Sequence, residues 1–222
     1  MNNMTPRTIE AISQDGILAR NKVLRQTYIL LGMNVLFSAV CAFVGMKLGI
    51  GRISPVLAII AMLGLSWGIT ANRNNGLGIV LLFALTGFLG FYLSHAMNMY
   101  VAYGMGSVVV KALVGTAVLF FGLSAYVLFT GTNFTFLGGF LYTGMMVVIL
   151  AIIGSLFFDM SGLSLAISAA CLILFSGYVL YDTSNIIQGE ETNYIMATLQ
   201  LFLDIFNIFI SLLNLLSAFN RN

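Results

Sequence analysis

The chain has 222 residues, of which 60% are hydrophobic and only 7% charged, and its net charge is +2. So little polar surface excludes a soluble domain of this size. Nine Lys and Arg residues, with no long cluster, give no basis for nucleic-acid binding. The apolar runs are continuous rather than alternating, which favours helices over a membrane barrel. The composition therefore predicts an all-α polytopic membrane protein.

The first 27 residues are mixed polar, so we expect an N-terminal tail over 1–27 and a membrane domain over 28–222. The tail from Thr8 to Gln26 fits a short amphipathic helix interrupted at Gly16, or a solvated and poorly ordered segment. Lys and Arg favour the cytoplasmic side of a membrane. The N-terminus is therefore predicted to be cytoplasmic because cations precede the first apolar run, namely Arg20, Lys22 and Arg25.

About 20 apolar residues cross the hydrocarbon core of a bilayer as a helix. By this measure the sequence predicts seven transmembrane helices, joined by short connections that make consecutive helices antiparallel neighbours. The predicted spans are 28–48, 54–72, 76–97, 107–130, 134–157, 162–182 and 195–218. Ile186 and Ile187 follow the sixth span, so this helix is expected to run further.

Polar residues recur along the last apolar segment at intervals of four, three, four and three, which is the period of a helix. They are Gln200, Asp204, Asn207, Ser211 and Asn214. An acid in the middle of a membrane helix is costly in lipid and normally faces the interior of the bundle or a wet cavity. The stripe therefore predicts an internal polar path along this helix.

A second acid, Asp182, ends the sixth predicted span, and Asp204 lies about 13 Å into the seventh. On antiparallel neighbours the two side chains can reach a similar depth. Two close carboxylates in a low dielectric cannot both ionise easily and should share a proton. This predicts a proton-sensitive site, and carboxylate oxygens also suit calcium. Arg73, at the end of the second span, could neutralise the pair or merely anchor the topology.

The sequence allows other interpretations of the two aspartates. Each could simply hydrogen-bond a neighbouring helix, or the two could form the active site of an intramembrane aspartyl protease. The sequence before Asp204 is Leu-Phe-Leu rather than the Gly-x-Gly of that protease class, which speaks against an enzyme. Cys41 and Cys171 lie in separate apolar runs and form neither a disulfide framework nor a metal motif.

Four segments resemble a known family. Leu180-Tyr181-Asp182-Thr183, Glu191-Thr192-Asn193-Tyr194 and Leu201-Phe202-Leu203-Asp204-Ile205-Phe206-Asn207 look like the C-terminal signature of the Bax inhibitor-1 (TMBIM) family. The segment Val23-Leu24-Arg25-Gln26-Thr27-Tyr28 is similar to its bacterial YccA-like branch. The resemblance implies six helices surrounding a central seventh.

The same resemblance implies two functions. One is a pH-sensitive calcium leak, with Asp182 and Asp204 as the sensor and Arg73 as a closing latch. The alternative is modulation of the membrane-bound AAA protease FtsH through the cytoplasmic tail, without transport. The similarity to the bacterial branch implies a location in a bacterial inner membrane. The resemblance implies no cofactor beyond a calcium ion as permeant or bound ion.

Overall fold

The computed structural model describes residues 6–155 and 163–220 of the chain. This part is helical, with seven α-helices and one short 3-10 helix. They are α1 (Pro6–Leu48), α2 (Pro55–Ala71), α3 (Gly76–Ala102), α4 (Gly106–Thr130), η1 (Thr135–Leu137), α5 (Gly138–Ser155), α6 (Leu163–Gln188) and α7 (Tyr194–Phe219). The all-α polytopic membrane fold is thus confirmed.

Helix ends follow local sequence signals. Pro55 occupies the first turn of α2, where its missing N–H costs no hydrogen bond. Gly131 ends α4 with φ +64° and Gly189 follows α6 with φ +79°, a backbone region that glycine enters without strain. The sixth helix does continue past its predicted end, to Gln188. The junction between the fifth and sixth predicted spans, residues 156–162, lies outside the described residues.

Six of these helices are long and apolar enough to cross a membrane, and α2 is a shorter apolar helix of 17 residues. At 1.5 Å per residue α2 is about 25 Å long, at the lower limit for a spanning helix. The seven predicted spans therefore correspond to six full-length candidates and one short helix among the described residues. Many large apolar side chains on the outside are exposed, as expected where lipid is the solvent.

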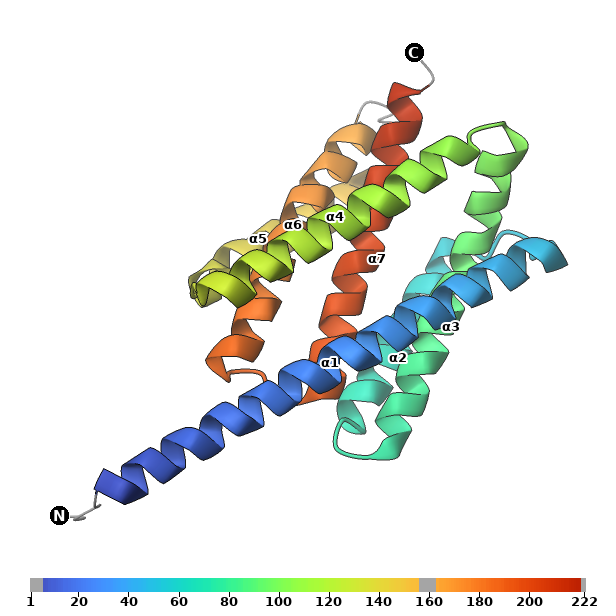
Figure 1. Ribbon diagram of the computed structural model, residues 1–222. Helices are drawn as coiled ribbons and strands as arrows, with labels where there is room; N and C mark the ends of the chain where they lie inside the picture. Colours follow the sequence, from blue (N-terminus) through green and yellow to red (C-terminus); the bar gives the residue numbers. More distant parts are fainter. Residues whose placement is uncertain (1–5, 156–162, 221–222) are drawn as a thin grey trace.

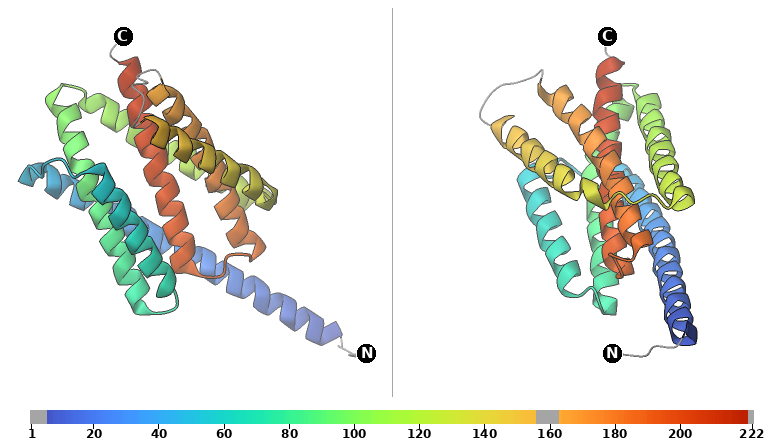
Figure 2. Two further views of the ribbon diagram at one scale, coloured as in Figure 1. Left: turned by 180° about the vertical axis from the view of Figure 1, so that it is seen from behind. Right: turned by 90° about the vertical axis from the view of Figure 1, so that its left-hand side faces the viewer.

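The first helix is longer than its predicted span. α1 is one continuous helix from Pro6, and it passes residue 27 without a break. The interpretation of the tail as poorly ordered is therefore wrong for residues 6–27, because Gly16 costs a helix only about 1 kcal/mol and does not end it. Figures 1 and 2 show the N-terminal part of α1 projecting away from the other helices.

The last helix lies in the middle of the bundle. α7 packs against α1, α2, α3, α4 and α6, whereas α5 packs against α6 and η1. Figure 2 shows α5 at the periphery. The expected arrangement around a central seventh helix is thus present, with five helices in direct contact with α7 and α5 one layer further out.

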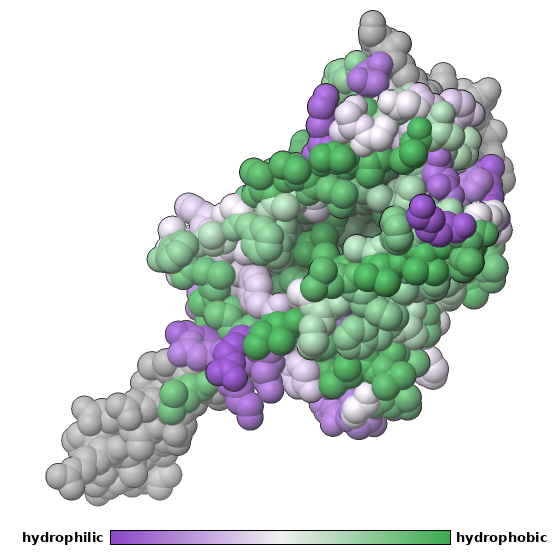
Figure 3. All heavy atoms as spheres, turned by 45° about the vertical axis from the view of Figure 1, so that its right-hand side comes forward, coloured by the Kyte–Doolittle hydropathy of each residue, from purple (hydrophilic) through white to green (hydrophobic). Residues whose placement is uncertain are grey.

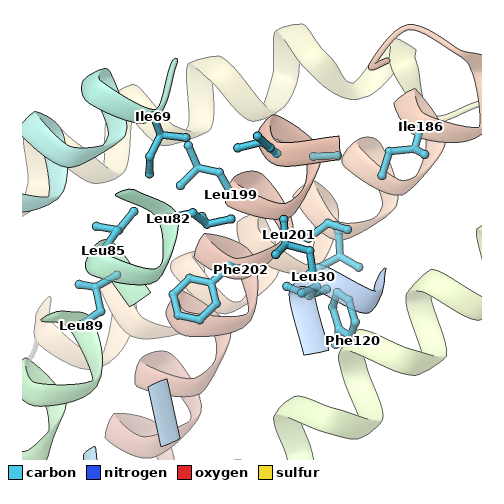
Figure 4. Packing of buried hydrophobic residues seen from close by; sticks show 14 of the residues in the cluster. Leu30, Ile69, Leu82, Leu85, Leu89, Phe120, Ile186, Leu199, Leu201 and Phe202 are labelled. Carbon is cyan, nitrogen blue, oxygen red and sulfur yellow. The ribbon is translucent and has the colours of Figure 1, made fainter. Parts of the chain in front are cut away.

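The main core gathers apolar side chains from α1, α2, α3, α4, α6 and α7, as Figure 4 shows. Among its fully buried members are Ile69, Leu82, Leu85, Leu201 and Ile208. Leu201 and Ile208 are seven residues apart on α7, which is two helical turns. This apolar core holds α7 in register and so fixes the depth of the polar groups between its turns.

α1 and α3 approach each other most closely where glycine replaces a side chain. A Cβ at Gly90 of α3 would collide with the backbone carbonyl of Ser38 on α1. A Cβ at Gly45 of α1 would lie 2.6 Å from the Ser94 hydroxyl on α3. Small residues permit such backbone approach in membrane bundles. The buried hydrogen bond from Thr86 to Asn34 Oδ1, 3.0 Å, joins the same two helices.

Candidate functional site

Asp182 of α6 and Asp204 of α7 meet inside the bundle. The two helices are antiparallel neighbours joined by a short connection after Gln188. Asp182 lies six residues before the end of α6, about 9 Å, and Asp204 ten residues into α7, about 15 Å. This difference in depth is small enough for side chains to bridge. Both residues are buried, with 5% and 4% of their surface exposed.

The carboxyl groups of Asp182 and Asp204 lie within hydrogen-bonding reach of each other. An ionised carboxylate can only accept, so a bond between two carboxyls requires that one of them carries a proton. A bond between these two groups would therefore give the pair one shared proton and one negative charge. Removing the proton would place two negative charges side by side in a low dielectric, which is strongly unfavourable.

Among the described residues, four buried side-chain oxygens have no hydrogen-bond partner. They are Asp204 Oδ2, Asn185 Oδ1, Thr27 Oγ1 and the Tyr28 hydroxyl. Asn185 is one turn from Asp182 on α6, whereas Thr27 and Tyr28 belong to α1. Buried polar atoms are rarely left unpaired, because each costs about 1–3 kcal/mol. Asp204 Oδ2 and Asn185 Oδ1 can therefore accept hydrogen bonds or coordinate a cation.

The residues that follow Asp182 fasten α6 to α4 and its following loop. The Thr183 and Ser124 hydroxyls are 3.3 Å apart across α6 and α4. Ser184 accepts a hydrogen bond from the Phe134 backbone N–H at 2.9 Å. Further along, the Gln188 side chain donates to the Gly131 carbonyl at 3.3 Å. The acid pair therefore sits on an α6 segment with fixed neighbours on one side and α7 on the other.

The other members of the predicted polar stripe differ in burial. Ser211 is buried, Gln200 and Asn207 are half-buried, and Asn214 is exposed. Asn207 donates to the Leu203 carbonyl of its own helix at 2.8 Å. None of the stripe residues lines the large cavity described below, which lies on the other side of α7. The polar path along the stripe stays a prediction.

The structure does not bring Arg73 to the aspartate pair. Arg73 is exposed in the turn between α2 and α3. Its carbonyl accepts a hydrogen bond from the Asn193 side chain at 2.8 Å, and the same amide donates to Asn74 Oδ1 at 3.0 Å. In residues 6–155 and 163–220, no ion pair links Arg73 to either aspartate. Its implied role as a latch stays a prediction.

Asn193 is a site residue that sequence reasoning missed. Its side-chain oxygen accepts from the backbone N–H groups of Ile195 and Met196 and so caps α7. Its amide nitrogen ties the same helix end to the α2–α3 turn. An Asn directly before an apolar helical run is a recognisable N-cap signal. The link to the turn had no such signal, because it joins segments about 120 residues apart.

Replacing Asn193 by Ala is expected to lower the free energy of unfolding by about 1–2 kcal/mol, because both the cap and the link are lost. Asn193→Asp keeps the capping oxygen but has no amide donor for the Arg73 carbonyl. It should therefore lose only part of this stability. Thermal unfolding in detergent measures the stability of both variants. Equal losses of stability in Asn193→Ala and Asn193→Asp would show that the cap contributes nothing beyond the link to the α2–α3 turn.

Charged metal ligands are few. Among the residues described, no group of three or more His, Cys, Asp and Glu side chains could hold a metal ion. Calcium takes six to eight oxygens. The aspartate pair could thus contact a passing cation, whereas a resident calcium ion would need further oxygens from backbone, amides or water.

Cys41 and Cys171 are both free thiols, as expected.

Comparison with known proteins finds a family model described as "Inhibitor of apoptosis-promoting Bax1", which matches residues 20–221. The chain is 43% identical to "Modulator of FtsH protease YccA" of Escherichia coli K12 over 93% of this chain and 94% of that protein. It is equally similar, over the same shares, to "Inner membrane protein YccA" of Escherichia coli O6:H1. It is 28% identical to mouse "Protein lifeguard 4" over 95% of this chain and 90% of the mouse protein.

Proposed function

Since this chain belongs to the Bax inhibitor-1 family, we propose that it modulates the FtsH protease of a bacterial inner membrane and is not itself an enzyme. The observation that carries this proposal is the 43% identity, across almost the whole of both chains, to a protein named as a modulator of FtsH. A second relative of equal similarity is named an inner membrane protein. Identity over the full length supports the same architecture in these proteins.

The projecting part of α1 is the proposed contact with the protease. α1 has 43 residues and is about 65 Å long, twice the ~30 Å hydrocarbon thickness. Its candidate membrane span begins only at Arg20. The turns from Pro6 onward therefore extend beyond the span (Figure 1). With the cytoplasmic N-terminus that Arg20, Lys22 and Arg25 predict, these turns would face the cytoplasm.

The base of this projection is fixed to the centre of the bundle. Thr198 of α7 donates to the Thr27 carbonyl of α1, and Thr27 is fully buried. Leu30 and Leu31 belong to the main core. The helix is continuous from this base to Pro6. A partner that binds an already helical tail pays a lower entropic cost than one that must order a flexible tail.

Deleting residues 2–15 is expected to abolish the effect of the protein on FtsH-dependent degradation of a membrane substrate. The bundle should still insert and fold, because the deletion ends before the candidate span at Arg20. The degradation rate of the substrate in cells or proteoliposomes is the measurement. A variant in which 2–15 is replaced by Gly and Ser of the same length is the control for helix content. Full modulation by the deleted protein would contradict the tail as the contact.

A second function, proton-dependent passage of a cation, is favoured by a separate observation. Asp182 and Asp204 are buried within hydrogen-bonding reach of each other, and Asp204 Oδ2 and Asn185 Oδ1, one turn from Asp182, have no partner among the described residues. Loss of the shared proton would force the carboxylates apart or draw in a cation, and either outcome changes the α6–α7 contact. Calcium flux into liposomes at several pH values tests this function, and its absence at every pH would exclude it.

A further inference from the structure

A cavity of about 680 Å³ opens at the side of the bundle between α1 and α4. α7 forms its floor, with Phe202 and Phe209 buried and Phe206 half-buried. The rim side chains are exposed, among them Leu36 of α1 and Phe121 of α4. Figure 3 shows an apolar surface with a hollow in it. In a membrane the mouth of this cleft faces the hydrocarbon, and an apolar cavity of this kind does not hold water.

The cleft is long. Its lining on α1 runs from Tyr28 to Met46, which at the helical rise is about 27 Å, close to the ~30 Å thickness of the hydrocarbon. Most of its lining side chains are apolar. The material that meets an apolar cleft open to the membrane is the hydrocarbon of the lipids, so the cleft suits acyl chains.

The chemistry at the N-terminal end of the cleft suits a phospholipid. The Tyr28 side chain lines this end, with its ring centroid 6.3 Å from that of Phe120. Arg25 is exposed one turn earlier, on the side of α1 that lines the cleft further along. Arginine forms strong charge-assisted hydrogen bonds with phosphate. At the opposite end Lys47 lies over the Phe43 ring, 5.5 Å from its centroid.

We propose that this cleft binds one acyl chain of an anionic phospholipid from the leaflet on the N-terminal side. The phosphate lies at Arg25, and the chain runs past the Tyr28 ring and over Phe206. Phe202 and Phe206 are each two residues from Asp204, about 200° around the α7 axis. The lipid and the aspartate pair thus contact opposite faces of one helix. Occupancy of the cleft would brace α7 against α6, independently of any contact with a protease.

Tryptophan quenching can detect the chain directly. The single tryptophan of the sequence, Trp67, is exposed on α2 and can be replaced by Phe. In that background Phe206→Trp places a reporter in the cleft floor. Phe175→Trp is the matched control, because Phe175 is half-buried on α6 and does not line the cleft. The proteins are reconstituted in phosphatidylcholine vesicles with increasing phosphatidylglycerol that carries bromine on its acyl chains.

The Phe206→Trp reporter is expected to be quenched several-fold more than the control at low brominated phosphatidylglycerol, with saturation. Brominated phosphatidylcholine should lack this preference. Arg25→Gln should raise the half-saturating lipid fraction several-fold, while Lys47→Gln leaves it unchanged. Equal and linear quenching of both reporters would overturn the proposal, as would saturation without any preference for the anionic lipid.

Filling the cleft provides an independent variant. Gly32 lines it, and a Cβ there meets no atom within 4 Å, so Gly32→Phe or the smaller Gly32→Leu should fold and remove the excess quenching. Val40→Phe is the control, because Val40 is exposed outside the cleft. Unchanged quenching in both folded Gly32 variants would contradict the proposal. So would oxidative cross-linking of Gly32→Cys between copies without quenching, which would identify a second copy as the occupant.

Discussion

Replacing Asp204 by Asn is expected to leave the bundle folded and to abolish the pH dependence of any cation flux. The Asn side chain still offers a donor to Asp182, as a protonated carboxyl does, but it cannot lose that donor when the pH rises. In the unmodified protein, loss of the shared proton places two carboxylates against each other within the bundle. Calcium flux in liposomes across a pH series measures the difference, and Asp182→Asn should behave in the same way.

Two further variants make this test specific. Ser211→Ala removes another buried polar group from the same side of α7, outside the pair, and should keep the pH dependence. Asp204→Leu removes the donor altogether and leaves a buried charge on Asp182 unpaired. Such a loss costs about 3–5 kcal/mol, so this variant should be far less stable than Asp204→Asn. A pH-dependent flux that survives in both Asn variants would show that the sensor lies elsewhere.

Gly90→Leu is expected to destabilise the bundle strongly. A side chain there collides with the Ser38 backbone carbonyl, so α1 and α3 must move apart, and overpacking of this kind costs about 1–3 kcal/mol or more. Gly64→Leu is the matched control, because a Cβ at Gly64 of α2 meets nothing within 4 Å. It should be neutral or slightly stabilising, since Leu favours the helix more than Gly.

Thermal unfolding in detergent and the amount of protein in the membrane measure both glycine variants. α1 and α3 both line the cleft proposed to bind lipid, and α1 continues into the projecting helix proposed to contact FtsH. Gly90→Leu should therefore weaken both the binding of lipid and the modulation of FtsH. Equal melting temperatures for Gly90→Leu and Gly64→Leu would show that the close approach of α1 and α3 contributes nothing to stability.

The acid pair could be predicted from the sequence because two strong constraints act on it. Helical spacing placed Asp204 on one side of its helix, and the short connection after Gln188 made α6 and α7 antiparallel neighbours. An ionisable group in a membrane helix must then turn inward. The contact between Asp182 and Asp204 needed no further information.

The apolar cleft between α1 and α4 and the place of α5 could not be predicted. In a membrane bundle the side chains that face lipid and those that face another helix are equally apolar, so the pattern does not assign neighbours. Phe202, Phe206 and Phe209 are indistinguishable in sequence from core residues such as Leu201. The continuous α1 was missed for a different reason. Gly16 and a polar composition suggested a break, but a glycine inside a helix costs only about 1 kcal/mol and does not end it.

Infrared spectroscopy tests most directly whether Asp182 and Asp204 hold one proton between them. The carbonyl stretch of a protonated carboxylic acid is separate from the bands of ionised carboxylates and shifts in heavy water. At neutral pH the account predicts one such band in the unmodified protein, and none when both residues are replaced by Asn. A spectrum without this band, or one in which the band persists in the double variant, would contradict the shared proton.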